Sequence, residues 1–154
     1  MNSPEISTKA SESIKRHMIA GAVAGALPFP WVGLASLAAI QLNMLRHLAS
    51  IYNTTFSDEV GKSAIAALVG TDFSIGFSSS LARLVPGPTG AIASVAGGVM
   101  GAASTFALGK IFVQHFESGN TFLTFDPEKV RAHYQQLYKM GVADSPSSFA
   151  GIRP

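Results

Sequence analysis

The chain has no cysteine, which excludes disulfides, thiolate metal sites and cysteine catalysis. Charged residues make up only 13% of its 154 residues, about half the usual share of roughly 25%. The net charge of +2 and the lack of any Lys/Arg-rich stripe disfavour a nucleic-acid partner. From the length we expect one domain, and the absence of cysteine favours a reducing compartment such as the cytoplasm.

Two long runs of the sequence, 18–45 and 84–109, contain no charged residue at all. Each run is interrupted by a Pro-x-Pro pair, Pro28 and Pro30 in the first and Pro86 and Pro88 in the second. Proline lacks an amide hydrogen and disfavours helix at the residue before it, so a helix must end before each pair and can restart after it. We therefore predict an all-α fold of helical hairpins broken at Pro-x-Pro turns, packed as an Ala/Gly-rich bundle with a C-terminal amphipathic helix.

Apolar spacing and capping residues give the expected elements. Helices are predicted over 14–27, 31–52, 57–69, 71–85, 89–116 and 127–140, with Ser57 and Asp126 as N-caps and Gly119 and Gly141 after helix ends. The segment "TFLTF" (121–125) alternates and is expected to be extended. The organisation we expect is a flexible lead over 1–13, an apolar helical-hairpin domain over 14–119, a linker and amphipathic helix over 120–142, and a flexible tail over 143–154.

A stripe of small residues follows one face of the helix predicted over 89–116. Its members recur at a spacing of four: Ala93, Gly97, Gly101, Thr105 and Gly109. Such a stripe lets another helix backbone approach closely, both in a bilayer and in water. It predicts tight helix packing, and a homo-oligomer formed through this face.

Polar and aromatic residues inside the first uncharged run have two interpretations each. Gln41 is an interhelical hydrogen-bond donor or part of a solvent-facing stripe, and we favour the first. Trp31 and Phe29, like Phe77 further on, are either anchors at a membrane interface or ordinary core aromatics.

No residue set specifies a reaction. His115 and Glu117 are two candidate metal ligands, but a spacing of two on a helix points them apart, and we expect His115 to satisfy polar groups at a helix end. Gly61-Lys62-Ser63 ends like a phosphate-binding loop, yet Phe56 stands where that motif needs glycine. We therefore expect no catalytic, metal-binding or cofactor-binding residue, and no enzyme.

Two segments, "AIQLNML" (39–45) and "ALGKIFVQHFESG" (107–119), resemble a known family. They are similar to the domain of unknown function of YcjF-like bacterial inner-membrane proteins, which is also appended to some Era-like GTPases. The resemblance covers roughly 18–119. It implies a bacterial, membrane-associated, mostly helical module with a GTPase partner and no established activity. The chain differs from the fused members in carrying no GTPase motifs.

The leading hypothesis is a non-enzymatic membrane-associated helical protein that serves as an interaction or scaffold module. Pro28, Pro30, Pro86 and Pro88 would mark turns buried in the bilayer, while Lys and Arg residues flanking the runs stay on one side. This predicts location at the bacterial inner membrane with the charged ends facing the cytoplasm. Two alternatives remain open: each run crosses as a kinked span, or the chain is a soluble bundle that binds an apolar ligand or a partner protein.

Overall fold

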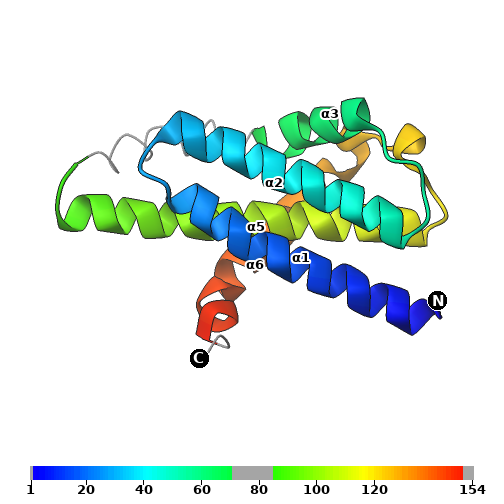
Figure 1. Cartoon of the computed structure of the whole chain (residues 1–154), viewed down its shortest axis with the longest axis horizontal. Helices are drawn as coiled ribbons and strands as arrows, with labels where there is room; N and C mark the ends of the chain where they lie inside the picture. Colours follow the sequence, from blue (N-terminus) through cyan, green and yellow to red (C-terminus); the bar gives the residue numbers. More distant parts are fainter. Residues whose placement is uncertain (1, 71–84, 151–154) are drawn as a thin grey trace.

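A computed structural model describes residues 2–70 and 85–150 of the chain (Figure 1). Its elements, in chain order, are α1 (Ser3–Ala26), α2 (Pro30–Ile51), α3 (Asp58–Leu68), α5 (Pro88–Glu117), the 3-10 helix η1 (Phe122–Thr124) and α6 (Pro127–Ala150). Within these two ranges all regular structure is helical and no strand is present, so the predicted all-α class is confirmed. The helix predicted over 71–85 lies almost wholly outside the described residues.

The first Pro-x-Pro pair separates α1 from α2 at the predicted place. Phe29 is the extended N-cap residue, and α2 begins at Pro30, where the missing amide hydrogen costs no helical hydrogen bond. The two helices then run antiparallel, because a Cβ added at Gly33 of α2 would lie 2.9 Å from the carbonyl oxygen of Ala24 in α1. The first uncharged run is therefore a helical hairpin.

The second Pro-x-Pro pair sets the start of α5 in the same way. Pro88 is the first residue of that helix, and Gly87 before it has a φ of 95°, a conformation that side-chain-bearing residues rarely adopt. Both α2 and α5 thus open with the second proline of their pair.

The N-terminal segment differs from the flexible lead expected over 1–13, since α1 already begins at Ser3. The amide of Asn2 donates to Glu5 Oε2 at 3.0 Å, one half of a capping box, and Pro4 lies in the first turn. Further along the same helix, Ala10 and Ile14 are 1% and 3% exposed. The prediction of a helix start near 14 was wrong because a local capping signal and two apolar contacts outweigh the Ser-rich composition.

Helix α5 is the longest element and lies between α1 and α6, with α1 and α2 packed along it (Figure 1). A Cβ added at Gly101 would overlap the carbonyl oxygen of Gly21, and one added at Gly25 would overlap that of Gly97. The predicted small-residue stripe therefore makes backbone contact, but with α1 of the same chain. The homo-oligomer contact expected from this stripe is replaced by an intramolecular one, since α1 already occupies the face.

Two helices end on residues with positive φ, and of these Gly119 was predicted from the sequence. Asn53 after α2 has a φ of 52°, and the amide of Thr54 bonds to the carbonyl of Ala49 at 2.9 Å. Gly119 after α5 has a φ of 78°, and its amide bonds to the carbonyl of Phe116 at 2.9 Å. Both arrangements satisfy carbonyls that a helix end leaves unpaired.

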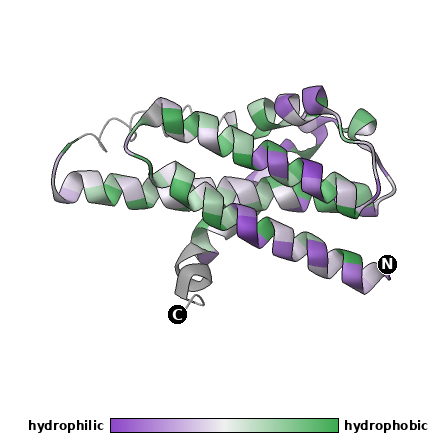
Figure 2. Cartoon of the chain, in the orientation of Figure 1, coloured by the Kyte–Doolittle hydropathy of each residue, from purple (hydrophilic) through white to green (hydrophobic). Residues whose placement is uncertain are grey.

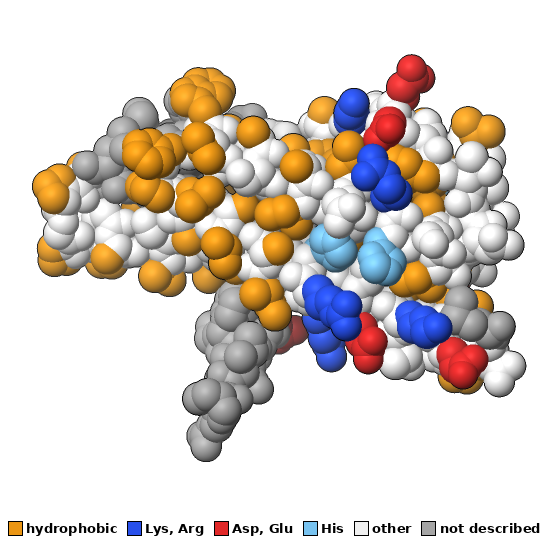
Figure 3. Space-filling model, viewed as in Figure 1, with side chains coloured by type: hydrophobic (Ala, Val, Ile, Leu, Met, Phe, Trp, Pro, Cys, Tyr) orange, Lys and Arg blue, Asp and Glu red, His pale blue; other side chains and the backbone are white. Residues whose placement is uncertain are grey.

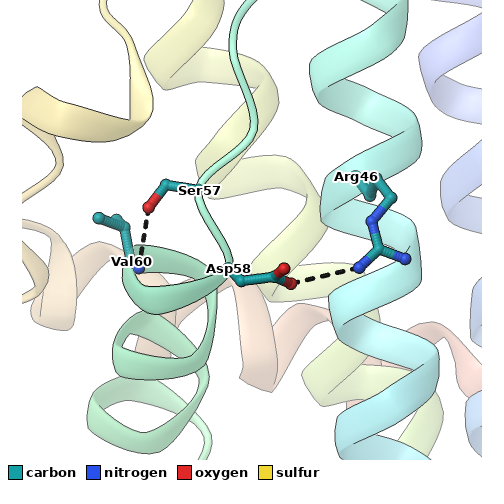
Figure 4. A network of polar contacts seen from close by, with 4 residues as sticks. All are labelled: Arg46, Ser57, Asp58 and Val60. Atoms are coloured by element: carbon teal, nitrogen blue, oxygen red, sulfur yellow. Dashed lines mark hydrogen bonds and ion pairs between the residues drawn. The ribbon is translucent and has the colours of Figure 1, made fainter.

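Helix α3 begins at the predicted cap. Ser57 Oγ accepts a long hydrogen bond of 3.4 Å from the amide of Val60, and the next residue, Asp58, pairs with Arg46 of α2 at 3.2 Å (Figure 4). The guanidinium of Arg46 also lies 5.0 Å from the centre of the Phe56 ring. Both charged side chains of the pair are about half exposed, so the pair orients the α2–α3 connection more than it stabilises the fold.

The segment 121–125, expected to be extended, instead contains η1. The amide of Thr124 bonds to the carbonyl of Thr121 at 3.1 Å, and the ring of Phe122 is buried 5.0 Å from that of Phe112 in α5. Leu123 remains 85% exposed. The segment therefore buries the ring of Phe122 alone, and not the alternate residues that an extended strand would bury. A short apolar run cannot distinguish these two outcomes from its periodicity.

Helix α6 begins after Asp126, whose Oδ1 accepts from the amide of Glu128 at 3.1 Å, in agreement with the predicted N-cap. It does not end at Met140 but continues to Ala150, so the expected helix end at Gly141 was wrong. A Cβ added at Gly141 would lie 3.0 Å from the Cα of Ala103 in α5. This glycine therefore serves helix crossing and not helix termination.

One hydrophobic core joins residues from α1, α2, α3, α5, η1 and α6. Its three largest fully buried members are Phe112 of α5, Phe122 of η1 and Tyr134 of α6. The linker and helix that we expected as a unit over 120–142 share this core with the preceding helices. Hydrophilic residues concentrate away from the α1–α2 turn and the start of α5 (Figure 2).

Candidate functional site

Exposed large hydrophobic side chains gather at the end of the molecule that carries the two proline pairs. Those on α1, α2 and α5 or beside them are Ile19, Val23, Phe29, Trp31, Val32, Val85, Ile92 and Val95, between 47% and 72% exposed. We call this set the apolar end. In Figure 3 hydrophobic side chains cover the left part of the visible face, whereas charged and His side chains lie over the right part.

The aromatic residues singled out at the first turn are surface residues. Phe29 is 62% exposed and Trp31 is 72% exposed, so neither is a core aromatic. Pro28, Pro86 and Pro88 are exposed beside them. Phe77 lies outside the part of the chain that the structure describes. Of the two interpretations given above, only a surface role fits Phe29 and Trp31.

Charged residues on α1, α2 and α5 begin at one common level, marked by Gly109 of α5. A Cβ added there would lie 2.7 Å from a side-chain carbon of Ile14 in α1 and 3.2 Å from the sulfur of Met44 in α2. Arg16 and Arg46 stand two residues after these contacts, and Lys110 follows Gly109 directly. We call this level the charge boundary. On the side of the turns, α1 after Arg16, α2 before Arg46 and α5 before Lys110 carry no charge.

Among the described helices, α5 is the one long and apolar enough to cross a membrane, with a mean hydropathy of 1.6 over its best window. Half of that window is buried within the protein, as it also is in core helices of soluble proteins. The length and composition of α5 alone therefore do not decide between a membrane and a soluble setting.

Gln41 is fully buried where α2 meets α5. Its Nε2 donates to Ser104 Oγ at 3.1 Å and to Thr105 Oγ1 at 3.3 Å, and both hydroxyls donate to the carbonyl of Gly101. The side-chain carbonyl Oε1 of Gln41 is buried with no hydrogen-bond partner in the described structure. The amide thus forms the interhelical hydrogen bonds expected of it, but only through its nitrogen.

A second polar contact joins α1 and α2 nearer the charge boundary. The ring of His17 bonds through Nδ1 to the carbonyl of Ser13 at 2.7 Å, and through Nε2 to Asn43 Nδ2 at 3.2 Å. A carbonyl accepts only from N–H, so Nδ1 carries the proton and Nε2 accepts from the amide of Asn43. His17 is thereby held in one tautomer and one orientation.

His115 and Glu117 do not form a site together. His115 Nε2 bonds to the carbonyl of Thr121 at 2.8 Å, which ties the end of α5 to η1. Glu117 Oε1 instead accepts from Tyr52 OH at 2.9 Å. In the described ranges no group of three or more His, Asp or Glu side chains could hold a metal. His115 makes the helix-end contact expected of it.

The Tyr52–Glu117 hydrogen bond and the bond from His133 to Gln114 Oε1, at 2.7 Å, were not predicted. The two bonds join residues that are 65 and 19 positions apart, so no local spacing signals either of them. Desolvation, followed by the hydrogen bond to Glu117 and its negative charge, raises the pKa of Tyr52 well above its ordinary value.

Residues 3–141 match the family described as "Domain of unknown function (DUF697)". Magnetosome membrane protein 22 of Magnetospirillum gryphiswaldense is 33% identical over 138 residues, which cover 87% of this chain and 71% of that protein. No solved structure matches the chain.

Proposed function

This chain belongs to the DUF697 family of domains of unknown function, and on that premise we propose that it is a non-enzymatic membrane protein whose apolar end inserts into a lipid bilayer. The resemblance of the sequence to a domain of bacterial inner-membrane proteins agrees with the family assignment. In addition, a relative carries "membrane protein" in its name. The observation that carries the proposal is the charge boundary, because three helices lose their charges at one level in space.

The dimensions support partial insertion. From Arg16 to the end of α1 at Ala26 the helix rises about 15 Å at 1.5 Å per residue, half of a hydrocarbon core of about 30 Å. On α5, the helix rises about 22 Å by the same measure from Pro88 to Ala103, the residue at which α6 crosses it. Lys139 and Asp144 flank this crossing and place charge there. The α1–α2 hairpin and the start of α5 would then enter the membrane from one side without crossing it.

The charges beside the boundary suggest the orientation. Those nearest to it on α1, α2 and α5 are all basic: Lys15, Arg16, Arg46 and Lys110. Basic residues next to membrane segments stay on the cytoplasmic side. We therefore propose the bacterial inner membrane as the location, with the charged end of the protein in the cytoplasm.

The resemblance to domains fused to Era-like GTPases implies a GTPase partner and a scaffold role, and we carry both as part of the proposal. We call the opposite end of the molecule, which carries η1 and the C-terminal ends of α2 and α5 (Figure 1), the polar end, and it is left free to meet such a partner. Leu123 of η1, 85% exposed there, offers an apolar contact. Loss of GTPase co-purification in a Leu123→Ser variant, with membrane binding kept, is the expected result. Unchanged co-purification would show that the GTPase does not contact η1 through Leu123.

The chain's one tryptophan reports on insertion without a label, because Trp31 lies in the apolar end. We expect its fluorescence to shift to shorter wavelength when lipid vesicles are added, and to be quenched by lipids brominated in their acyl chains. Emission that stays at the wavelength of a hydrated indole would overturn the proposal and favour a soluble bundle.

A pair of matched variants tests the same proposal. Ile92 of α5 is 71% exposed at the apolar end, and Leu123 is 85% exposed at the polar end. A charge in the hydrocarbon core costs about 3 kcal/mol, so Ile92→Glu should weaken vesicle binding roughly a hundredfold. Leu123→Glu adds the same charge at a position that is at least as exposed and should leave binding unchanged. Equal effects of the two variants would contradict insertion through the apolar end.

A further inference from the structure

Two shallow hollows lie along the groove between α1 and α2 and meet at Arg16 and His17. The hollow towards the apolar end has a volume of about 390 Å³ and is lined by Arg16, His17, Ala20, Ala39, Ile40 and Asn43. The hollow towards the polar end has a volume of about 280 Å³, and its lining includes Ser13, Arg16, His17 and His47. We call the two together the α1–α2 groove.

The position of the groove matters more than its size. Arg16 belongs to the charge boundary, and within the described structure it makes no ion pair. The charge boundary has a second arginine, Arg46. It pairs with Asp58 and lies over the Phe56 ring, so it is directed towards α3. Arg16 is therefore the guanidinium at this level that remains available to an anion.

The walls of the groove hold fixed hydrogen-bonding groups. The ring of His17 is locked by Ser13 and Asn43, and it meets the ring of His47 edge to face, with centroids 6.3 Å apart. Ser13 is 5% exposed, and its buried hydroxyl has no hydrogen-bond partner among the residues that the structure describes. A hydroxyl without a partner and an unpaired guanidinium suit an anion that can accept several hydrogen bonds.

The other half of the groove is apolar. Ala20, Ala39 and Ile40 line it on the side that faces the turns, and Ile19 and Val23 of α1 continue the exposed apolar surface from there. A ligand seated here would meet a cation at one end and hydrocarbon-like surface at the other. That is the pattern of a phospholipid, with a charged headgroup and an acyl chain.

We propose that the α1–α2 groove binds an anionic phospholipid, with the headgroup phosphate at Arg16 and an acyl chain along Ala20, Ala39 and Ile40. This inference rests on the proposed membrane insertion, which places Arg16 at the depth of the headgroups. Lys9 and Glu12 line the far end of the groove, and their opposite charges cancel. The net positive charge of the groove therefore comes from Arg16. A free phosphate ion would use the same cation but would gain nothing from the apolar half.

The test compares binding of the whole chain to vesicles of phosphatidylcholine alone and to vesicles in which part of it is replaced by phosphatidylglycerol. Arg16→Gln should lower affinity for the anionic vesicles about tenfold or more, the scale of a lost charge-assisted hydrogen bond. Lys15→Gln removes the same charge from the neighbouring position, outside both hollows, and should lower it at most about fivefold. Equal losses in the two variants would overturn a specific site in favour of diffuse attraction.

A second variant addresses the apolar half. Ala39→Phe should fill the groove beside Ile40 and reduce the preference for phosphatidylglycerol while Trp31 still inserts. An unchanged preference in this variant would overturn the groove as the lipid site. Circular dichroism of each variant checks that the helices are retained.

Two further arms separate the sources of the signal. Inorganic phosphate should not displace the protein from phosphatidylglycerol vesicles at matched ionic strength, and displacement would overturn the commitment to a lipid headgroup. If Trp31 inserts equally into both kinds of vesicle and affinity does not differ, only the headgroup site fails. If Trp31 inserts into neither, the proposed membrane function fails with it.

Discussion

Gly101 of α5 lies directly against Gly21 of α1, so closely that a Cβ at Gly101 would overlap the carbonyl oxygen of Gly21. The contact is between two backbones, and neither can move away as a flexible side chain would. This close packing is thus built from residues that have no side chain, on helices far apart in the sequence.

The first prediction concerns this contact. Alanine favours a helix over glycine by up to about 1 kcal/mol, but overpacking against a rigid neighbour costs about 1–3 kcal/mol. Gly101→Ala should therefore destabilise the protein. Gly98→Ala on the same helix is the matched control, since its Cβ would lie 3.1 Å from the carbonyl oxygen of Ala22 and needs only a small shift. Urea denaturation followed by circular dichroism compares them, and a Gly101→Ala variant as stable as Gly98→Ala would contradict the packing described.

The second prediction concerns Gln41. Its amide nitrogen makes two hydrogen bonds, while its buried carbonyl oxygen makes none. Replacing the amide by an apolar group loses those two bonds but also removes a buried oxygen without a partner, so the two effects on stability partly offset each other. Gln41→Met keeps the volume and should cost less than about 1.5 kcal/mol, whereas Gln41→Ala should cost about 2–4 kcal/mol through the cavity it leaves. Thermal or urea unfolding of the two variants measures the difference. A methionine variant as unstable as the alanine variant would show that the hydrogen bonds dominate.

The third prediction follows from the raised pKa of Tyr52. The unfolded chain releases the tyrosine proton near pH 10, but the folded protein holds it to higher pH. Unfolding therefore releases a proton above about pH 10, and stability falls as pH rises through that range. Below it, the contribution of Tyr52 is fully present. Tyr52→Phe should flatten the alkaline decline in unfolding midpoints measured across a pH series. A decline that is equally steep in the variant would assign it to other groups.

The fourth prediction concerns topology and uses the absence of native cysteine. Single cysteines at Phe29 and Thr89 should be protected from a water-soluble thiol reagent, because Phe29 belongs to the apolar end and Thr89 lies beside it at the start of α5. Cysteines at Ser50 and Ser118, exposed near the ends of α2 and α5, should both react, and from the same side of the membrane. Comparing intact with opened cells measures this, and labelling of Ser50 and Ser118 from opposite sides would show a full crossing.

Much of the fold follows from local chemistry. Pro30, Ser57 and Gly119 mark helix ends through missing donors, capping oxygens and positive φ, and each of these acts within a few residues. The start of α1 was missed although Asn2 and Glu5 have the spacing of a capping box. Gly141 was misassigned because its reason for being glycine lies in another helix, at Ala103.

The candidate site was predictable in kind but not in arrangement. The uncharged runs and Pro-x-Pro pairs indicate apolar turns directly. That Arg16, Arg46 and Lys110 stand at one level depends on the register of three helices, which no local pattern specifies. The stripe through Gly97 and Gly101 predicted a close neighbour correctly, yet its identity required the structure.

Helix α1 has a mechanical consequence, because it runs unbroken from Ser3 to Ala26. Residues 3–9 of it are largely exposed, Ala10 and Ile14 already lie in the core, and Gly21 and Gly25 further on lie against α5 (Figure 1). A continuous hydrogen-bonded helix turns as one rod. A displacement of the exposed start of α1 would therefore reach the glycine contact only by also moving Ala10 and Ile14 in the core.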